Sequence, residues 1–487
     1  MTFARERLAL WLAWVLPAAL FLATAYRDVG YWDTGEMDTV PYIMGIAHPT
    51  GFPAYVLLGW IVTHVLPFGT VAFRMTLISV ASLATVAFII ARIVYERYGN
   101  AWAGAIAAWI FATGGVVWAH ATKAEVHAFA TLATAATLYC ALRWYRDGEK
   151  RWFYFGAIAW SVGIATHPVC ALLLPGLLVL LIARLHRLPS KTLIGAIALA
   201  CGIVIAFYAY IPLRSAYVNA HGLDPQRALG LPAGRPFFDY DDASTWDGLR
   251  AEISGSDFDV NGGLRAIVSP DVYARRGHLY LEALRDEFTW FGLILLAGGI
   301  AYAFARDRLI ASVLLICGAV AVPFALGYRD ETDLGRYFIT SFVIGSVFIG
   351  GAIAGAARFA SWSRLLVPAG ATALAVVLGS TQPNFFHQPS DDRPRREIAS
   401  VERITDPDAM IVANWAYGTP LAYAAYVDRS FGARGLDVAW IDDDADYVRE
   451  WAKTRPVYYV GGIPGSVPGY RLEALTVRPP IYRLVKL

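Results

Sequence analysis

Charged side chains are scarce in this sequence, and long apolar runs take their place. Only 16% of the 487 residues are Asp, Glu, Lys or Arg, and 57% are hydrophobic, whereas soluble domains carry about 25% charged residues. This composition excludes an ordinary soluble protein and predicts an all-α polytopic membrane protein. The formal net charge is only +2, so no strong field attracts nucleic acid and we expect no nucleic-acid partner.

Cysteines and cofactor motifs are also few. All 4 cysteines lie inside apolar runs, which argues against a disulfide framework. The motifs HExxH and CxxC are absent, so no metal site is predicted, although a divalent metal is not excluded. GxGxxG and Walker-type loops are absent as well, so no cofactor is predicted and no phosphate-binding loop for a soluble nucleotide donor is evident. An enzyme built on this chain would need a donor that is available in the membrane itself.

Long apolar runs recur from the N-terminus to residue 380. A spanning helix needs about 20 mostly apolar residues. Eleven runs meet or nearly meet that length: 8–25, 74–94, 101–118, 124–142, 152–167, 168–185, 192–213, 287–304, 309–326, 335–357 and 364–380. The first run lacks a clear cleavage site, so we expect it to be retained as a helix. A twelfth run, 53–66, has only fourteen residues, which suits an interfacial or re-entrant segment.

Basic residues in the short loops predict the orientation. If 53–66 does not cross, one side holds fifteen Lys and Arg, near 5–7, 92–97, 143–151, 184–191, 306–308 and 358–364. The other side holds five, which are Arg27, Arg74, Lys123, Arg329 and Arg336. The positive-inside rule therefore predicts about eleven spans with a cytoplasmic N-terminus.

Two domains are expected. Residues 1–380 form the transmembrane domain, with outer loops at 26–73 and 214–286. Residues 381–487 follow a Pro-rich linker and form a small extracytoplasmic α/β domain. Its expected strands are the apolar runs DAMIVAN, LDVAWID and PVYYVGG, and PLAYAAYVD between the first two predicts a helix.

The first outer loop carries Asp33, Glu36 and Asp38 among apolar residues. An ordinary solvated loop is the simpler explanation. A carboxylate at the membrane boundary is partly desolvated, however, and we expect its pKa to be raised, as a general base requires. His48 begins the rigid bend HPTGFP and is either held over a cavity or caps the next helix.

Other ionisable residues collect at the same predicted side of the membrane. Such residues at membrane depth are often functional, but each has a structural alternative. Lys123 and Glu125 can pair with each other, His167 can be a His-Pro corner, and Arg214 can snorkel at a helix end. Arg329, Asp330, Glu331, Asp333 and Arg336 can form an ion-pair network, a phosphate contact, or both.

An ordered set of short motifs carries a family resemblance. These are DTGE (33–36), GIAHPTGFPAY (45–55), AEVHAF (124–129), GIATHP (163–168), YIPLRS (210–215) and DLGRYF (333–338). The set resembles the GT-C superfamily of integral-membrane glycosyltransferases, and more closely a bacterial branch related to the eukaryotic transmembrane protein O-mannosyltransferases. Thr50 and His127 depart from the family pattern, which usually has Pro and Tyr at these positions.

The resemblance implies sugar transfer from a polyprenyl-phosphate-linked donor to an acceptor hydroxyl on a protein, glycan or lipid, with inversion at the sugar. It implies Asp33 as general base, with Glu36 orienting or replacing it. Arg214 is the first candidate to meet the leaving phosphate. Further candidates for the donor site are Arg74, Lys123, His48, His167, Glu125, Asp333 and Arg336. The implied location is the bacterial inner (plasma) membrane.

Two other functions remain open. A lipid or sugar transporter would also have many spans and buried charges, but transporters often show repeated halves, and no repeat is evident here. A non-catalytic scaffold that binds a glycolipid would keep the architecture and not need the acidic pair. The position of the polar residues at one side of the membrane favours the enzyme.

Overall fold

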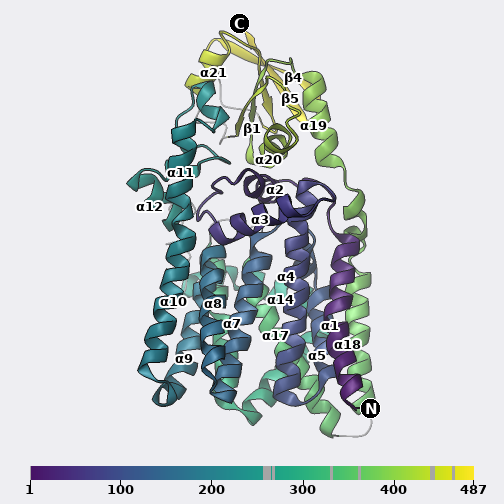
Figure 1. The fold of residues 1–487 in the computed structure, drawn as a ribbon. Coiled ribbons are helices and arrows are strands. Elements are labelled where there is room, and N and C mark those ends of the chain that lie inside the picture. The colour runs from purple at the N-terminus through teal and green to yellow at the C-terminus, as the bar shows by residue number, and fades with distance from the viewer. Residues whose placement is uncertain are drawn as a thin grey trace.

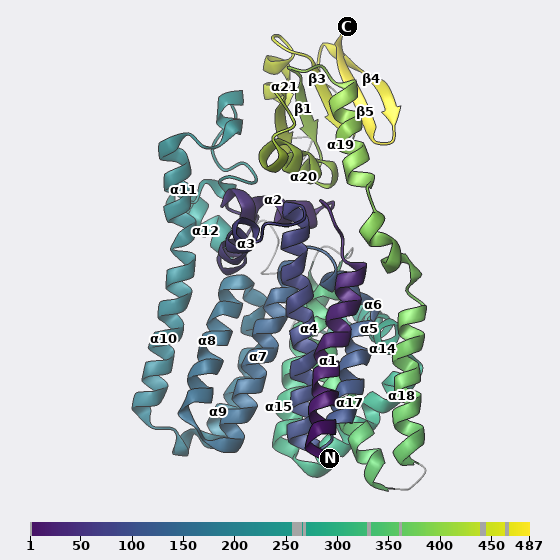
Figure 2. The same cartoon turned by 45° about the vertical axis from the view of Figure 1, so that its right-hand side comes forward.

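The computed structural model describes residues 2–255, 265, 269–328, 333–359, 363–438, 445–462 and 467–487. Figure 1 shows a bundle of long helices, a crosswise layer of two helices over one of its ends, and a small sheet domain beyond that layer. The N-terminus lies at the opposite end of the bundle from the C-terminus (Figures 1 and 2).

The bundle contains most of the helical residues. Its elements are α1 (Thr2–Thr24), α4 (Val71–Tyr98), α5 (Ala101–Thr113), α6 (Gly115–Ala121), α7 (Val126–Asp147), α8 (Lys150–Thr166), α9 (Leu174–Arg184), α10 (Ser190–Tyr208), α11 (Tyr210–His221), α14 (Pro270–Arg306), α15 (Arg308–Ala319), α16 (Ala321–Gly327), α17 (Gly335–Phe359) and α18 (Ser363–Ser380). Every run that was predicted to span overlaps at least one of these helices, and the runs 101–118, 192–213 and 309–326 each extend over two consecutive helices.

Fewer helices qualify as spans by length and hydropathy than the eleven expected. Among the described residues seven qualify, or eight if α5 and α6, which meet at a 75° bend, are one span. The other three expected spans fall on α7, α8 and α18. Helix α8 has only 17 residues, and α7 carries polar and charged side chains along its last turns.

The predicted outer loops contain more helix than expected. The 26–73 segment holds α2 (Asp33–Ile43) and α3 (Pro53–Val65), which lie across the end of the bundle in Figure 1. This orientation agrees with the prediction that 53–66 does not cross. The 214–286 segment is not one long loop, because α11 continues to His221, α12 covers Trp246–Ser254, and α14 already begins at Pro270.

The C-terminal domain is a five-stranded mixed sheet with helices. It contains α19 (Arg393–Ile404), β1 (Met410–Ala413), α20 (Trp415–Tyr423), β2 (Gly435–Val438), α21 (Ala445–Trp451), β3 (Val457–Val460), β4 (Tyr470–Val477) and β5 (Pro480–Lys486). The strand order is β2-β1-β3-β5-β4, with β1 parallel to β2 and β3 and the remaining pairs antiparallel.

Three of these strands match the apolar runs identified in the sequence. Strands β1, β2 and β3 are fully buried, as continuous apolar strands of a parallel sheet should be. Strands β4 and β5 were missed because they form an antiparallel hairpin whose residues are mostly half-buried or exposed, so they show no continuous apolar run.

Helices α14 and α17 pack closely at Gly299. A Cβ added at Gly299 would lie 1.9 Å from the backbone oxygen of Phe348, whereas a Cβ at neighbouring Gly298 would meet nothing within 4 Å. Small residues let membrane helices approach this closely.

We therefore expect Gly299→Ala to destabilise the bundle, because the new methyl group must push α14 away from α17. The expected loss is about 1–3 kcal/mol, measured as a lower unfolding temperature of the detergent-purified protein. Gly298→Ala is the matched control and should leave that temperature unchanged or raise it slightly, since Ala is the better helix former. Equal effects of the two substitutions would contradict this account of the packing.

Candidate active site

Helix α2 begins at Asp33 and lies between the end of the bundle and the C-terminal domain (Figure 1). Asp33 and Glu36 lie in its first turn, where the positive end of the helix dipole favours carboxylates. The preceding residue, Trp32, has φ 56° and ψ −144°, a backbone conformation that costs about 1–3 kcal/mol in a residue other than glycine. Such a conformation persists only where the contacts around it hold it in place.

Two donors from distant parts of the chain hold the Asp33 carboxylate. Arg336 Nη1 on α17 donates to Asp33 Oδ2 at 3.0 Å, and Trp415 Nε1 on α20 donates to Asp33 Oδ1 at 3.0 Å. The side chain of Asp33 is still 35% exposed, so it remains accessible from solvent.

The expected rise in the pKa of Asp33 is wrong. Burial alone would raise this pKa, but the charges of His48 and Arg336 and the hydrogen bonds from Trp415 and Arg336 lower it below its ordinary value. By contrast, the pKa of Asp38 on the same helix is raised, mainly by burial, since this side chain is 1% exposed. Asp33 is therefore ionised at neutral pH, which is the form that accepts a proton.

Glu36 is turned away from solvent and holds His48. The carboxylate is fully buried, accepts the backbone N–H of His48 at 2.8 Å, and contacts His48 Nδ1. Burial opposes the charged imidazole, but the Glu36 carboxylate outweighs it and raises the pKa of His48. Glu36 therefore orients the HPTGFP bend, and His48 in turn lowers the pKa of Asp33.

A second cluster of charges forms between the α6–α7 connection and the start of α17. Lys123 Nζ lies 3.8 Å from Glu125 Oε2 and 3.7 Å from Asp333 Oδ2. His120 Nε2 lies 3.5 Å from the same Asp333 oxygen. Burial opposes ionisation of Asp333, but His120 and Lys123 lower its pKa. Lys123 and Glu125 thus form the predicted pair and share it with Asp333.

Three residues of this second cluster could hold a metal ion. One ligand atom each from His120, Glu125 and Asp333 lie within 4.8 Å of one another. The Lys123 ammonium contacts both carboxylates, so their charge is already partly balanced. The expectation that no metal is bound stays a prediction. Residues 329–332, which include Arg329, Asp330 and Glu331, lie outside the described part of the chain.

Aromatic and imidazole rings connect the two groups of charges. The His48 and Phe52 rings pack edge-on with their centres 5.0 Å apart, and the Phe52 ring stacks on His167 with a distance of 5.5 Å between ring centres. His167 lies 4.4 Å from His127, whose Nδ1 is 2.9 Å from Glu125 Oε1. His167 Nδ1 also accepts the backbone N–H of Val169 at 3.1 Å, so the expected His-Pro corner is present.

Arg214 and Arg74 donate hydrogen bonds to backbone oxygens and not to the carboxylates described above. Arg214 Nη2 donates to the backbone oxygen of Ile43 at 3.2 Å, and its guanidinium lies over the Tyr217 ring. Arg74 donates to the backbone oxygens of Thr63, Leu66 and Thr70, which satisfies the C-terminal end of α3. These contacts make Arg74 a structural residue, and Arg336 is the arginine that contacts Asp33.

Trp415 is the site residue that the sequence did not reveal. It is separated from Asp33 by 382 positions and comes from the C-terminal domain. Phe237, from the 214–286 segment, stacks on it at 6.0 Å. No motif marks either residue, because a single aromatic side chain in an apolar sequence carries no pattern.

We expect Glu36→Gln to reduce the pH dependence of stability. Because the pKa of His48 is raised in the folded state, the Glu36–His48 pair contributes fully below about pH 6.5, the ordinary histidine pKa. That contribution is lost as the pH rises through the higher folded-state pKa. Between pH 6 and pH 9 the unfolding temperature of the wild type should therefore fall more than that of the variant.

The expected size of this contribution is about 1–3 kcal/mol. Glu282→Gln is the matched control, since Glu282 is exposed on α14. The same pH dependence in the wild type and in Glu36→Gln would show that the pair does not affect stability.

Comparison with known proteins covers the segment that holds Asp33. Residues 33–190 match the family described as "Protein O-mannosyl-transferase TMEM260 N-terminal domain". Protein O-mannosyl-transferase tmem260 of Dictyostelium discoideum is 28% identical over 26% of this chain and 16% of its own length. TMEM260 of Mus musculus is 28% identical over 41% of this chain and 29% of its own length. The chain thus matches less than a third of the length of these relatives.

Solved structures resemble the whole chain. ArnT from Cupriavidus metallidurans, in a crystal structure bound to undecaprenyl phosphate, superposes with a TM-score of 0.59 at 11% identity, over 98% of this chain and 97% of ArnT. The oligosaccharyltransferase AglB from Archaeoglobus fulgidus, in complex with an inhibitory peptide and a dolichol-phosphate, gives a TM-score of 0.54 at 12% identity, over 94% of this chain and 70% of AglB. The predicted resemblance is confirmed: residues 33–190 match the TMEM260 O-mannosyl-transferase N-terminal domain, and the chain has the same fold as ArnT and AglB.

Proposed function

We propose that this protein is a membrane glycosyltransferase that moves a sugar from a polyprenyl-phosphate-linked donor to a hydroxyl group of an acceptor. The observation that carries the proposal is the ionised, partly exposed Asp33 carboxylate, held by Arg336 and Trp415 at the end of a GT-C bundle. The match to O-mannosyl-transferases over 33–190 and the lipid phosphates in the ArnT and AglB structures support it.

In the proposed reaction Asp33 accepts the proton of the acceptor hydroxyl while that oxygen bonds to the anomeric carbon of the sugar. The bond from this carbon to the phosphate oxygen breaks on the opposite face, and its electron pair leaves with the polyprenyl phosphate. One displacement inverts the anomeric centre. The lowered pKa of Asp33 makes it a weaker base than expected, but keeps it deprotonated over the whole physiological pH range.

The charge that develops on the leaving phosphate needs fixed cations. Arg336 is our first candidate, because its guanidinium lies at the same end of the bundle as Asp33 and its buried Nε has no hydrogen-bond partner among the described residues, so it can still donate to a phosphate. Lys123 follows, since its ammonium is 24% exposed and lies against the carboxylates of the second cluster. Arg214 remains a second choice. The proposal requires no cofactor other than the lipid-linked donor.

The position of Asp33 at one end of the bundle also suggests on which side of the membrane the proposed reaction takes place. The lipid-linked sugar would emerge from the bilayer at the end of the bundle where Asp33 lies, and the acceptor would arrive from the aqueous side. By the positive-inside rule this end is extracytoplasmic and the N-terminus is cytoplasmic, in a bacterial inner membrane. The acceptor class, whether protein, glycan or lipid, is left to experiment.

Transfer from a panel of radiolabelled polyprenyl-phosphate sugars tests the proposal. Purified wild type should transfer one sugar, and Asp33→Asn should lose at least about 10²-fold in kcat, since a positioned base contributes about 10²–10⁴-fold. Asp271→Asn is the matched control, because Asp271 is exposed on α14, and should keep full activity. Donor binding by Asp33→Asn should persist.

Two outcomes would contradict this assignment. Full activity of Asp33→Asn would move the base to another residue. Failure of the wild type to bind or turn over any donor, with acceptors of all three classes supplied, would favour a transporter or a non-catalytic scaffold.

Arg336→Gln and Arg214→Gln should differ in their pH–rate profiles. Arg336→Gln removes a charge and a hydrogen bond that lower the pKa of Asp33, so the acid limb of the pH–rate profile should shift to higher pH. We also expect kcat to fall by about 10²-fold. Arg214→Gln should leave the acid limb in place. A shift in the acid limb only in Arg214→Gln would contradict the assignment of Arg336.

A further inference from the structure

We propose that the C-terminal domain is part of the active site and that Trp415 is a positioning residue for Asp33. This inference rests on the function proposed above. It assigns to the domain a role in the reaction itself, in addition to any contact with the acceptor. Figures 1 and 2 both show α20, the helix that carries Trp415, directly over α2, the helix that begins with Asp33.

Two hydrogen bonds together restrict the rotation of the Asp33 carboxylate, which a single hydrogen bond would not do. Trp415 donates to Oδ1 and Arg336 donates to Oδ2, each at 3.0 Å. The two donors come from different elements, so together they set the rotation of the carboxylate plane. Each oxygen keeps a second lone pair for the substrate proton. Removal of the indole N–H would leave the carboxylate free to rotate about its contact to Arg336.

Trp415 is itself held on both sides. It is the first residue of α20, which Asn414 caps by accepting the backbone N–H of Tyr417 at 3.2 Å. Asn414 Nδ2 also donates to the backbone oxygen of Gly461, which follows β3. The Phe237 ring stacks on the indole with an angle of 12° between the ring planes. The position of the indole N–H is therefore determined by the sheet domain and by the 214–286 segment.

The same domain holds the residues just before Asp33. Arg395 on α19 binds both carboxylate oxygens of Asp28 at 2.8 Å. Tyr31 packs edge-on against Tyr417 of α20, with the two ring centres 6.3 Å apart. The strained Trp32 thus lies between Tyr31 and Asp33, both of which the C-terminal domain holds.

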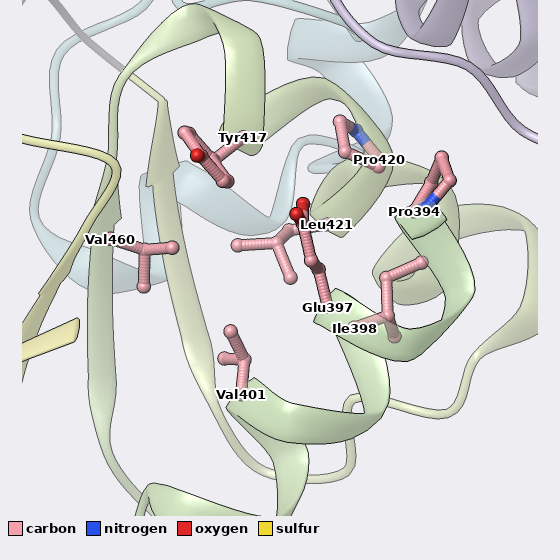
Figure 3. Close-up of a pocket in the computed structure, with 8 residues that line it drawn as sticks. All are labelled: Pro394, Glu397, Ile398, Val401, Tyr417, Pro420, Leu421 and Val460. Carbon is pink, nitrogen blue, oxygen red and sulfur yellow. The ribbon is translucent and has the colours of Figure 1, made fainter. Parts of the chain in front are cut away.

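The C-terminal domain packs closely against α2, and its own helices pack closely against each other. A Cβ added at Gly35 in α2 would lie 2.7 Å from Thr419 Oγ1 on α20, so the two helices touch. Figure 3 shows residues of α19 and α20 around a shared pocket, with the Glu397 carboxylate beside Leu421 and Ile398 directed toward Pro394. The cavity left between them has a volume of only about 10 Å³, room for about one water molecule.

Comparison of Trp415→Phe with Trp451→Phe tests the inference. Both substitutions remove one indole N–H bond from the C-terminal domain to another part of the chain, since Trp451 Nε1 donates to the backbone oxygen of Leu229, in the 214–286 segment, at 2.8 Å. Only Trp415 donates to Asp33. Phenylalanine keeps a ring that can still pack against Phe237.

We expect Trp415→Phe to lower kcat at least tenfold and to shift the acid limb of the pH–rate profile upward by about one unit. The KM for the lipid-linked donor should change less than twofold. Trp451→Phe should keep the wild-type pH profile. An unchanged acid limb in Trp415→Phe, in an enzyme whose wild type is active, would overturn the inference and leave the proposed function intact.

A second measurement does not depend on turnover. Unfolding temperatures of Trp415→Phe, Asp33→Ala and the double variant should deviate from additivity by about 2 °C, whereas Trp451→Phe and Asp33→Ala should be additive. Additivity of the Trp415 pair would overturn the inference whether or not transfer is detected. Coupling in a wild type that transfers no sugar would overturn the proposed function but not the contact.

Discussion

The hydrogen bonds to Asp33 join three parts of the chain at one carboxylate. Arg336 is part of the helix bundle, Asp33 begins the crosswise layer, and Trp415 belongs to the sheet domain. Both bonds depend on the carboxylate being ionised, because a protonated acid is a much weaker partner for a guanidinium and an indole N–H. One negative charge and its two donors thus link the helix bundle, the crosswise layer and the sheet domain.

The electrostatics of this end explain why burial does not raise the pKa of Asp33. Desolvation penalises a carboxylate, but a nearby positive charge or a hydrogen bond to the charged form can outweigh that penalty. Asp33 has Arg336, His48 and Trp415 around it, and its pKa is lowered. Asp38, only five positions later, has burial as its main influence, and its pKa is raised. Neighbouring carboxylates on one helix thus differ because their partners differ.

The division of roles between Asp33 and Glu36 follows from the turn of α2. Glu36 lies nearly one turn after Asp33 and points into the protein, where it binds His48. Asp33 stays partly exposed at the surface. A pair of carboxylates that look equivalent in the sequence DTGE therefore includes one that is open to solvent and one that is buried and organises the adjacent bend. The same bend leads through Phe52 and His167 to the second charged cluster.

The sequence by itself determined the membrane class, the position of the apolar helices, three of the five strands and the segments that gather at one end. These features follow from composition and from local hydrophobic periodicity, which act over a few residues. It could not show that α7, α8 and α18 fall short of the span criteria, or that the β4–β5 hairpin exists, since its strands are largely exposed. It also could not show which arginine contacts Asp33, because an arginine that snorkels, one that caps a helix and one that binds a ligand look the same in the sequence. Only the tertiary structure decided that Arg336 and Trp415, 303 and 382 positions from Asp33, share its carboxylate, because contacts across such separations depend on how the helices and the sheet domain pack.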